Sequence, residues 1–434
     1  MLGLELAMIF VLSQKNGLEI FFRGDGRDYE NLANNLIHYK TLAITPAPPY
    51  WPTNFRTPTY PFWLALIILL FKSLKPAVFI GATVFAFSAP LVYLISKTIF
   101  SEKIAFISAI LFTVEPWALY QSGFLSAEQI FMPIFLLSVY LFICYLKSSN
   151  RHYIYYSTFL LGVAVLTRPV ALFFVAIFLF LAFISELKIS FYQSIKMSAL
   201  IFLIFIAVLS PWFIRNKLVL NSWQFSSASG IRVFGDYIML KQYLNKVKPG
   251  ELIDIYEESR RLVGIKSDWE TMSVENSQKM SQVALQEIRA NFGIFTVMYF
   301  KNIAMYFVKN SYGNIFFDLG FSGSNIQSKI GNYLKRGLNP VVLIREATLS
   351  AKILIILFFF WPLITLLGVI GFLNIFKKNW RNLSFWFLVL WIIYFSVLTA
   401  IARDLSRYRL AIHAPLFIFA VLGFYKIKNY FFKS

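Results

Sequence analysis

The sequence predicts an all-α polytopic membrane protein, and three features carry that prediction. Of the 434 residues, 58% are hydrophobic and only 14% are charged, whereas soluble domains average about 45–50% and 25%. Apolar runs of the length needed to cross a bilayer, about 20 residues, recur along the chain. The basic residues stand singly or in pairs between these runs, as is typical of cytoplasmic loops. Because they form no stripe, the net charge of +20 does not indicate a nucleic-acid partner.

The cysteine and the histidines indicate neither a disulfide nor a metal centre. Cys144 is the single cysteine and lies inside an apolar run, so an internal disulfide cannot form and a thiolate metal site is not expected. His38, His152 and His413 are far apart and lack metal-ligand spacing. The sequence therefore predicts no cofactor.

Two apolar segments near the N-terminus are too short for ordinary spans. Met1–Leu12 is apolar apart from Glu5, but it lacks the basic start and the cleavage site of a secretory signal. We interpret it as a first span that is short or truncated. Tyr60–Phe71 would reach only about 18 Å as a helix, so we expect a juxtamembrane helix on the outer face.

Nine further apolar runs bring the prediction to about ten transmembrane helices. The runs are Ala77–Ser96, Ile104–Leu119, Phe124–Leu146, Tyr153–Leu166, Val170–Ile184, Ser198–Phe213, Leu349–Phe376, Leu383–Ala402 and Leu410–Tyr425.

The basic residues of the short loops predict the orientation. If the polar stretch Gly24–Pro61 is outside, every predicted inner loop is basic, in accordance with the positive-inside rule. The residues concerned are Lys97, Lys103, Lys147, Arg151, Lys188, Lys196, Lys377, Lys378, Arg381, Lys426, Lys428 and Lys433.

This topology divides the chain into three parts. Residues 1–213 form an N-terminal transmembrane core that includes a first outer loop at 14–75. Residues 214–348 form a large extracytoplasmic loop, in which we expect a helix from Asp268 and an interfacial helix over Ile294–Val308. Residues 349–434 form the C-terminal transmembrane helices.

Four groups of polar residues fall at the outer ends of the predicted spans. Ionisable groups at membrane depth are costly and usually functional. Arginines can grip a phosphate and stabilise it as a leaving group, and a carboxylate can take the proton from an attacking hydroxyl. The groups are Asp25, Asp28, Tyr29 and Arg56; Glu128; Arg168; and Arg215 together with the loop Arg403–Arg409.

Five motifs in order resemble the GT-C glycosyltransferases. GDGRDYENLANNL followed by FRTPTYPFWLA is similar to the first extracytoplasmic loop of the protein O-mannosyltransferase and aminoarabinose (lipid A) transferase branch. Asp25, Tyr29, Ala33, Arg56 and Pro58 match that pattern in order. The stretches LSAEQ, LTRP, PWFIRN and RYRLAIHAPL extend the resemblance over nearly the whole chain.

The resemblance implies a membrane glycosyltransferase with a polyprenyl-phosphate sugar donor and a lipid, glycan or protein acceptor. It implies direct, inverting displacement on the extracytoplasmic side of a bacterial cytoplasmic (inner) membrane. Asp25 would be the base or the carboxylate that orients the acceptor, Glu128 the second catalytic carboxylate, and Arg56 a contact to the donor phosphate. The pair Asp25 and Glu128 could also bind a divalent cation. The further substrate-binding candidates are Asp28, Tyr29, Tyr60, Arg168, Arg215, Arg407 and Arg409.

Departures and alternatives stay open at this point. The chain lacks a full first span, and Gly26 stands where some mannosyltransferases have the Glu of an Asp-Glu pair, so the sugar is not fixed. Asp25 and Asp28 could cap a helix that starts near Tyr29, and Glu128 could serve the helix dipole. The arginines could anchor lipid headgroups. A polysaccharide polymerase or ligase and a transporter for lipid-linked sugars are the alternative functions.

Overall fold

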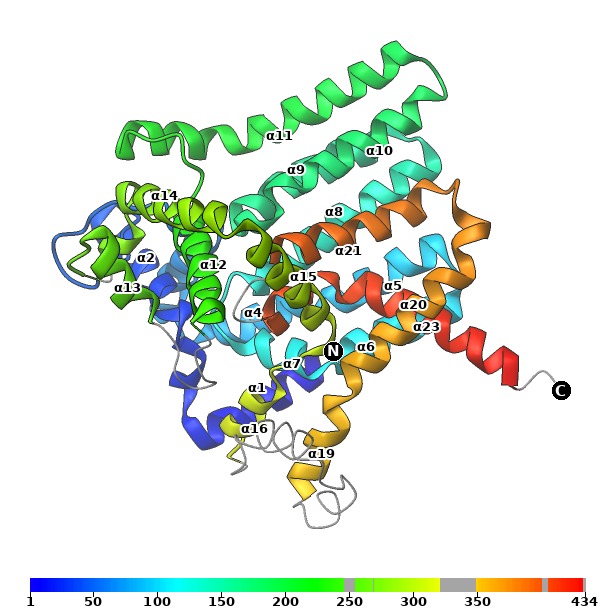
Figure 1. Cartoon of the computed structure of the whole chain (residues 1–434), viewed down its shortest axis with the longest axis horizontal. Coiled ribbons are helices and arrows are strands. Elements are labelled where there is room, and N and C mark those ends of the chain that lie inside the picture. The colour runs from blue at the N-terminus through cyan, green and yellow to red at the C-terminus, as the bar shows by residue number, and fades with distance from the viewer. Residues whose placement is uncertain (246–253, 268, 321–348, 400–404, 432–434) are drawn as a thin grey trace.

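The described part of the chain folds into helices joined by turns and loops. The computed structural model describes residues 1–245, 254–267, 269–320, 349–399 and 405–431 (Figure 1), and within these ranges it contains no β-strand. The first half comprises α1 (Leu2–Asn16), the 3-10 helix η1 (Leu18–Phe22), α2 (Asp25–Tyr39), α3 (Thr59–Phe71), α4 (Pro76–Ala86), α5 (Ser88–Ile99), α6 (Glu102–Val114), α7 (Pro116–Gly123), α8 (Glu128–Ser148), α9 (Arg151–Thr167), η2 (Pro169–Phe174), α10 (Val175–Leu187) and α11 (Phe191–Leu220).

The second half begins with a polar helical layer and ends with apolar helices. Its elements are α12 (Ala228–Leu244), α13 (Ile255–Val263), η3 (Glu270–Met272), α14 (Val274–Ala290), α15 (Phe292–Val308), α16 (Tyr312–Asp318), α19 (Leu349–Phe358), α20 (Phe360–Asn379), α21 (Leu383–Thr399), α22 (Leu405–Arg409), η4 (Leu410–Ile412) and α23 (His413–Phe431).

The described residues contain six helical stretches that are long and apolar enough to cross a membrane, or seven with a bent pair. These stretches confirm the prediction of an all-α polytopic membrane protein. The predicted number of about ten spans is not confirmed. The helices α3, α15 and α21 are apolar but shorter. The six stretches are Pro76–Ile99, Glu128–Ser148, Pro169–Leu187, Phe191–Leu220, Ile355–Asn379 and Ser406–Phe431.

The predicted continuous span Ile104–Leu119 is instead a broken helix. The helices α6 and α7 meet at an angle of 55°. Glu115 at the break has an extended backbone because the following Pro116 disfavours the helical conformation at the preceding residue. The Glu115 carboxylate accepts a hydrogen bond of 2.7 Å from the Ala118 amide and so caps α7. The Glu-Pro dipeptide is therefore the cause of the bend.

Opposite ends of the helical bundle carry different kinds of segment. In Figure 1 the turns between α10 and α11 and between α20 and α21 lie at the right, and α2, α13 and α14 lie at the left. The two turns at the right contain basic residues, including Lys188 and Arg381. The polar helices thus gather at the end away from these basic turns. Which side of the membrane this end faces stays a prediction.

The polar layer is built on its own apolar contacts. Phe234 and Ile238 of α12 pack against Met280 and Ala284 of α14. In the described residues, the α-helix of this region begins at Val274 after a 3-10 turn. Asp268, where the sequence predicts the start of a helix, lies outside those residues. The Ser273 hydroxyl accepts a hydrogen bond from the Asn276 amide and caps α14, which explains the later start.

Asp236 of α12 gives this layer a testable pH dependence. Burial raises the pKa of Asp236 to about 6, and the nearby Arg232 guanidinium only partly offsets this effect. A raised pKa in the folded state means that stability is lost as the pH rises from about 4 to about 6. We expect Asp236→Asn to raise the free energy of unfolding by roughly 2–3 kcal/mol at pH 7.5. Thermal unfolding at pH 4 should show little difference, and equal gains at both pH values would contradict the assignment.

Candidate active site

The helix α2 places two carboxylates side by side. Gly24, with a φ of 61°, is the N-cap residue, so α2 begins at Asp25 rather than near Tyr29. Asp25 and Asp28 are three residues apart and share one face of the helix. Both carboxylates bind arginine, and the structure therefore uses them as ion-pair partners rather than as helix caps.

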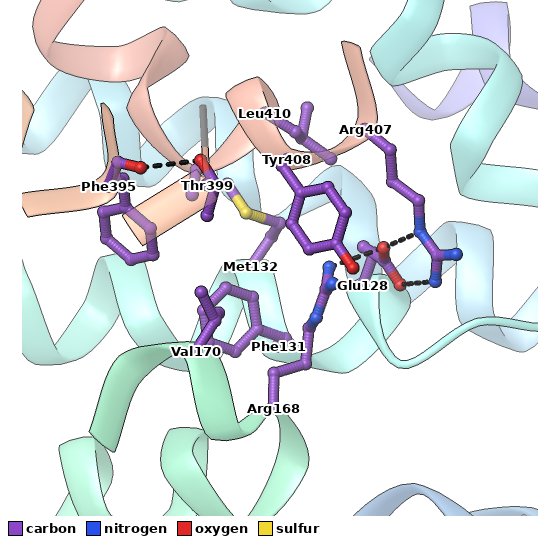
Figure 2. Close-up of a pocket in the computed structure, with 11 residues that line it drawn as sticks. Glu128, Phe131, Met132, Arg168, Val170, Phe395, Thr399, Arg407, Tyr408 and Leu410 are labelled. Atoms are coloured by element: carbon purple, nitrogen blue, oxygen red, sulfur yellow. Dashed lines mark hydrogen bonds and ion pairs between the residues drawn. The ribbon is translucent and has the colours of Figure 1, made fainter. Parts of the chain in front are cut away.

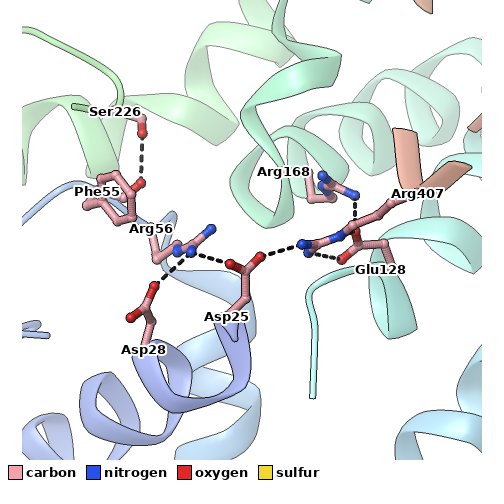
Figure 3. A network of polar contacts seen from close by, with 8 residues as sticks. All are labelled: Asp25, Asp28, Phe55, Arg56, Glu128, Arg168, Ser226 and Arg407. Carbon is pink, nitrogen blue, oxygen red and sulfur yellow. Dashed lines mark hydrogen bonds and ion pairs between the residues drawn. The ribbon is translucent and has the colours of Figure 1, made fainter. Parts of the chain in front are cut away.

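Arg56 binds both acids of α2 with one nitrogen. Its Nη2 lies 2.6 Å from Asp25 Oδ1 and 2.7 Å from Asp28 Oδ2 (Figure 3). The guanidinium also lies over the Tyr29 ring, at 5.3 Å, and the Phe55 ring, at 4.8 Å. The buried Nε has no hydrogen-bond partner among the described residues. Arg56 is thus held by two carboxylates and two aromatic rings, and one of its buried donors stays unsatisfied.

The backbone around Arg56 is fixed from three sides. The Ser226 hydroxyl donates to the Phe55 carbonyl at 2.8 Å, and the Thr57 hydroxyl donates to the Thr167 carbonyl at 3.0 Å. Arg215 Nη1 donates to the Thr53 carbonyl at 2.9 Å. The loop that carries Arg56 is therefore attached to α11, to the turn before α12 and to the residue before Arg168.

Glu128 is the first residue of α8 and is 1% exposed. Arg168 Nη1 lies 2.5 Å from its Oε1. Arg407 binds it in bidentate fashion, with Nε on Oε1 and Nη2 at 2.9 Å from Oε2. A buried carboxylate is stable only with such partners. Glu128 therefore does more than complement the dipole of α8.

Arg407 joins the Asp25–Asp28–Arg56 group to the Glu128–Arg168 pair. Besides binding Glu128, its Nη1 lies 2.7 Å from Asp25 Oδ2 (Figure 3). Asp25, Asp28, Glu128, Arg56, Arg168 and Arg407 form one network, which we call the acid–arginine cluster. Its formal charges balance, with three acids and three arginines. Residues from all four groups that the sequence singles out thus meet at one place.

The two acids of α2 have opposite pKa shifts. Burial by itself raises the pKa of Asp25, but the ion pairs with Arg407 and Arg56 outweigh it and hold this pKa well below its usual range. Burial also raises the pKa of Asp28, and its single partner Arg56 does not compensate fully. Burial raises the pKa of Tyr29 to about 12, so its hydroxyl stays protonated. Asp25 is thus the more firmly ionised of the two carboxylates.

A small pocket adjoins the cluster (Figure 2). Glu128, Arg168 and Arg407 line its polar side, and Tyr408 and Phe131 lie beside them. The Arg168 guanidinium lies 5.3 Å from the centre of the Tyr408 ring and 5.8 Å from that of Phe131. Two aromatic rings and one carboxylate therefore fix its orientation.

Tyr29 and Tyr60 pack against each other next to the cluster. Their rings meet edge to face at 4.6 Å. Tyr60 is fully buried, and its hydroxyl donates to Gln129 Oε1 at 2.7 Å. Tyr60 therefore connects α3 to α8, next to Glu128, and its side chain faces the protein.

Two predicted arginines do not join the cluster. Arg215 was grouped with the loop that contains Arg407, but it binds the Thr53 backbone and stacks on Trp212 at 5.1 Å. Arg409 is completely buried, lies 3.7 Å from the centre of the Trp361 ring and donates to two backbone carbonyls at the end of α15. Arg215 lies on α11 and Arg407 on α22. Arg215 contacts the loop that carries Arg56, whereas Arg407 contacts Asp25 and Glu128.

Tyr408 is a residue of the pocket that the sequence did not single out, although it stands between two predicted arginines in RYR. Its ring lies against the Arg168 guanidinium, and the ring also lies 5.8 Å from the Arg232 guanidinium. A signal was available, because guanidinium groups commonly stack on aromatic faces. Tyr408 thus helps to hold Arg168 at the wall of the pocket.

The described residues offer no evident metal centre. Within those ranges, no group of three or more His, Cys, Asp or Glu side chains is arranged to hold an ion. Arg403 and Asp404 of the predicted outer loop lie outside the described residues, so this statement does not cover them. A divalent cation between Asp25 and Glu128 stays a prediction.

The comparisons with known proteins agree with this architecture. The family model for dolichyl-phosphate-mannose-protein mannosyltransferases matches residues 55–214, which include Arg56, Glu128 and Arg168. In sequence, the chain matches no curated protein.

Solved structures extend the likeness to the whole chain. The apo oligosaccharyltransferase of Archaeoglobus fulgidus is similar, with a TM-score of 0.50 and 14% identity, over 100% of this chain and 51% of that one. The same enzyme, AglB, in complex with an inhibitory peptide and a dolichol-phosphate gives 0.50 and 13%, over 99% and 50%. ArnT from Cupriavidus metallidurans bound to undecaprenyl phosphate gives 0.39 and 10%, over 98% and 77%, a score too low to establish a shared fold.

The chain spans about half the length of the oligosaccharyltransferases that it matches. At this level of identity, the likeness establishes the fold alone. In its fold and in the sequence of residues 55–214, the chain is similar to the GT-C membrane glycosyltransferases, which confirms the resemblance that its motifs predict.

Proposed function

We propose that the chain is an integral membrane glycosyltransferase that uses a polyprenyl-phosphate-linked sugar. The acceptor is a lipid, a glycan or a protein, and the reaction takes place on the extracytoplasmic face of a bacterial cytoplasmic membrane. The observation that carries the proposal is the meeting of Asp25 and Glu128 on Arg407, with Arg56 and Arg168 on either side. This arrangement supplies both a base and a set of phosphate-binding guanidinium groups.

The proposed reaction is a direct displacement at the anomeric carbon. The acceptor hydroxyl oxygen forms the new glycosidic bond while the bond from the anomeric carbon to the phosphate oxygen breaks. The leaving polyprenyl phosphate keeps the electron pair, and the hydroxyl proton passes to Asp25. Arg56 and Arg168 stabilise the negative charge that grows on the phosphate.

The pairing in the free protein explains how Asp25 becomes a useful base. A carboxylate held by two arginines is ionised but only weakly basic. A donor phosphate competes with the carboxylates for the same guanidinium groups. When Arg56 turns toward the phosphate, Asp25 loses one of its two cationic partners, and its pKa rises. Donor binding therefore prepares the base for the acceptor.

Arg215 offers a test of the phosphate-binding part of this proposal. Because Arg215 holds the Thr53 carbonyl, Arg215→Ala should displace the loop that carries Arg56. We expect the KM for the donor to rise about 10-fold, which corresponds to roughly 1.4 kcal/mol, close to the lower limit for a hydrogen bond to a charged group. Steady-state kinetics with varied donor measure this effect. An unchanged KM would show that the loop does not depend on Arg215.

Product analysis tests the proposed function itself. Membranes that contain the protein are given a radiolabelled polyprenyl-phosphate sugar, and free polyprenyl phosphate is measured. A transferase consumes the donor and releases the lipid phosphate in step with sugar incorporation. A transporter moves the donor without consuming it, and that result would contradict the proposal.

A further inference from the structure

Asp318, the last residue of α16, connects the two segments that carry Asp25 and Glu128. Its side chain is 4% exposed. Arg23 Nη1 donates to Asp318 Oδ1 at 3.0 Å, and Arg23 Nη2 binds Oδ2. The Tyr120 hydroxyl donates to the same Oδ2 and accepts a hydrogen bond of 2.7 Å from Arg23 Nη2. The three side chains form a closed triangle, which we call the Asp318 triangle.

Two corners of the triangle lead directly to the acid–arginine cluster. Arg23 lies two residues before Asp25, at the junction between η1 and α2. Tyr120 belongs to α7, and the turn that follows α7 ends at Glu128, the first residue of α8. A backbone hydrogen bond of 2.9 Å from the Leu125 amide to the Phe21 carbonyl joins these segments again. The triangle therefore lies between the supports of both acids.

Asp318, the third residue of the triangle, lies on a helix that is bonded to its neighbours at both ends. Asn16 Nδ2 donates to the Asp318 carbonyl at 2.8 Å, and Lys15 Nζ donates to the Leu319 carbonyl at 3.4 Å. At the other end of α16, the Tyr312 hydroxyl donates to Glu115 Oε1 at 2.7 Å. The helix α16 is thus fastened at both ends to the N-terminal helices.

We infer that Asp318 is a positioning residue that sets the placement of Asp25 relative to Glu128. The inference rests on the proposed function. Without the charge of Asp318, Arg23 loses the partner that holds it against Tyr120, and the start of α2 is no longer tied to α7. A small displacement of a base lowers the rate of proton transfer strongly. The donor phosphate is less affected, because Arg56 and Arg168 have their own supports.

The kinetics of five variants test this inference. We expect Asp318→Asn and Arg23→Gln to lower kcat about 10- to 100-fold, with the KM for the donor changed less than about 2-fold. The double variant should fall no further than the lower single variant, because both act through one triangle. Asp318→Glu keeps the charge and should recover part of kcat. Tyr120→Phe removes the two hydrogen bonds of the Tyr120 hydroxyl but leaves the Arg23–Asp318 ion pair in place. It is the variant to measure if Asp318→Asn does not fold.

Several outcomes would overturn the inference. An unchanged kcat in Asp318→Asn and Tyr120→Phe is one. A parallel loss of kcat, donor affinity and thermal stability is another, because it would indicate a general structural role.

Glu30→Gln, which removes the exposed pair with Arg27 on α2, is the matched control and should behave as wild type. Asp25→Asn in the same assay separates the two claims: if it keeps full activity the proposed function fails, and if only the Asp318 variants are normal this inference alone fails.

Discussion

Asp25→Asn is expected to lower kcat about 100- to 10,000-fold, the usual contribution of a general base. The amide has nearly the shape of the carboxylate, but it cannot accept the proton of the acceptor hydroxyl. It also leaves Arg407 and Arg56 with less negative charge around them, so the KM for the donor should stay the same or fall. Steady-state kinetics with both substrates varied measure the two effects separately.

The control for this variant lies on the same helix. Glu30 forms an exposed ion pair with Arg27, and such pairs contribute little. Glu30→Gln should therefore leave kcat and KM unchanged. An active Asp25→Asn enzyme, or an equal loss in both variants, would remove Asp25 from the role of base.

Arg407→Gln is the second change with a large expected effect. Arg407 bridges Asp25 and Glu128, so the substitution separates the two halves of the acid–arginine cluster. Breaking a buried pair costs about 3–5 kcal/mol, and we expect both a lower thermal stability and a loss of activity of at least about 100-fold. Arg407→Lys should recover stability better than activity, because one ammonium group cannot reproduce the bidentate contact with Glu128.

Arg27 provides a matched control for Arg407. It also binds two carboxylates, those of Glu19 and Glu30, but all three side chains are more accessible than those of the cluster. Arg27→Gln should change stability by less than about 1 kcal/mol and leave activity unaltered. If Arg407→Gln behaved in the same way, the bridge would have no role in either folding or catalysis.

Much of the site was predictable because its residues stand out against apolar surroundings. Asp25, Asp28 and Arg56 lie in one polar stretch, and their contact required only that the loop fold back on itself. Glu128 and Arg168 were predictable as ionisable groups at the ends of apolar runs. Their meeting with Arg407 depends on how distant helices pack, since 279 positions separate Arg407 from Glu128.

Other features could not be derived from such patterns. Arg215, Arg407 and Arg409 all follow or precede apolar runs, yet only Arg407 reaches the cluster, because the direction of each side chain is set by helix rotation. Asp318 is a lone acid in a long polar region, and its partners come from α7 and from the residue before Gly24. The bend at Glu115 was visible in the Glu-Pro pair, but hydropathy alone merges α6 and α7 into one span.

Mass spectrometry of the lipids and surface glycans of cells tests the central claim most directly. Cells with the protein, cells without it and cells with Asp25→Asn are compared. The account predicts that one glycan or glycolipid disappears without the protein and stays absent with Asp25→Asn, although the variant is present in the membrane. Full restoration of the missing glycan by Asp25→Asn would contradict the account.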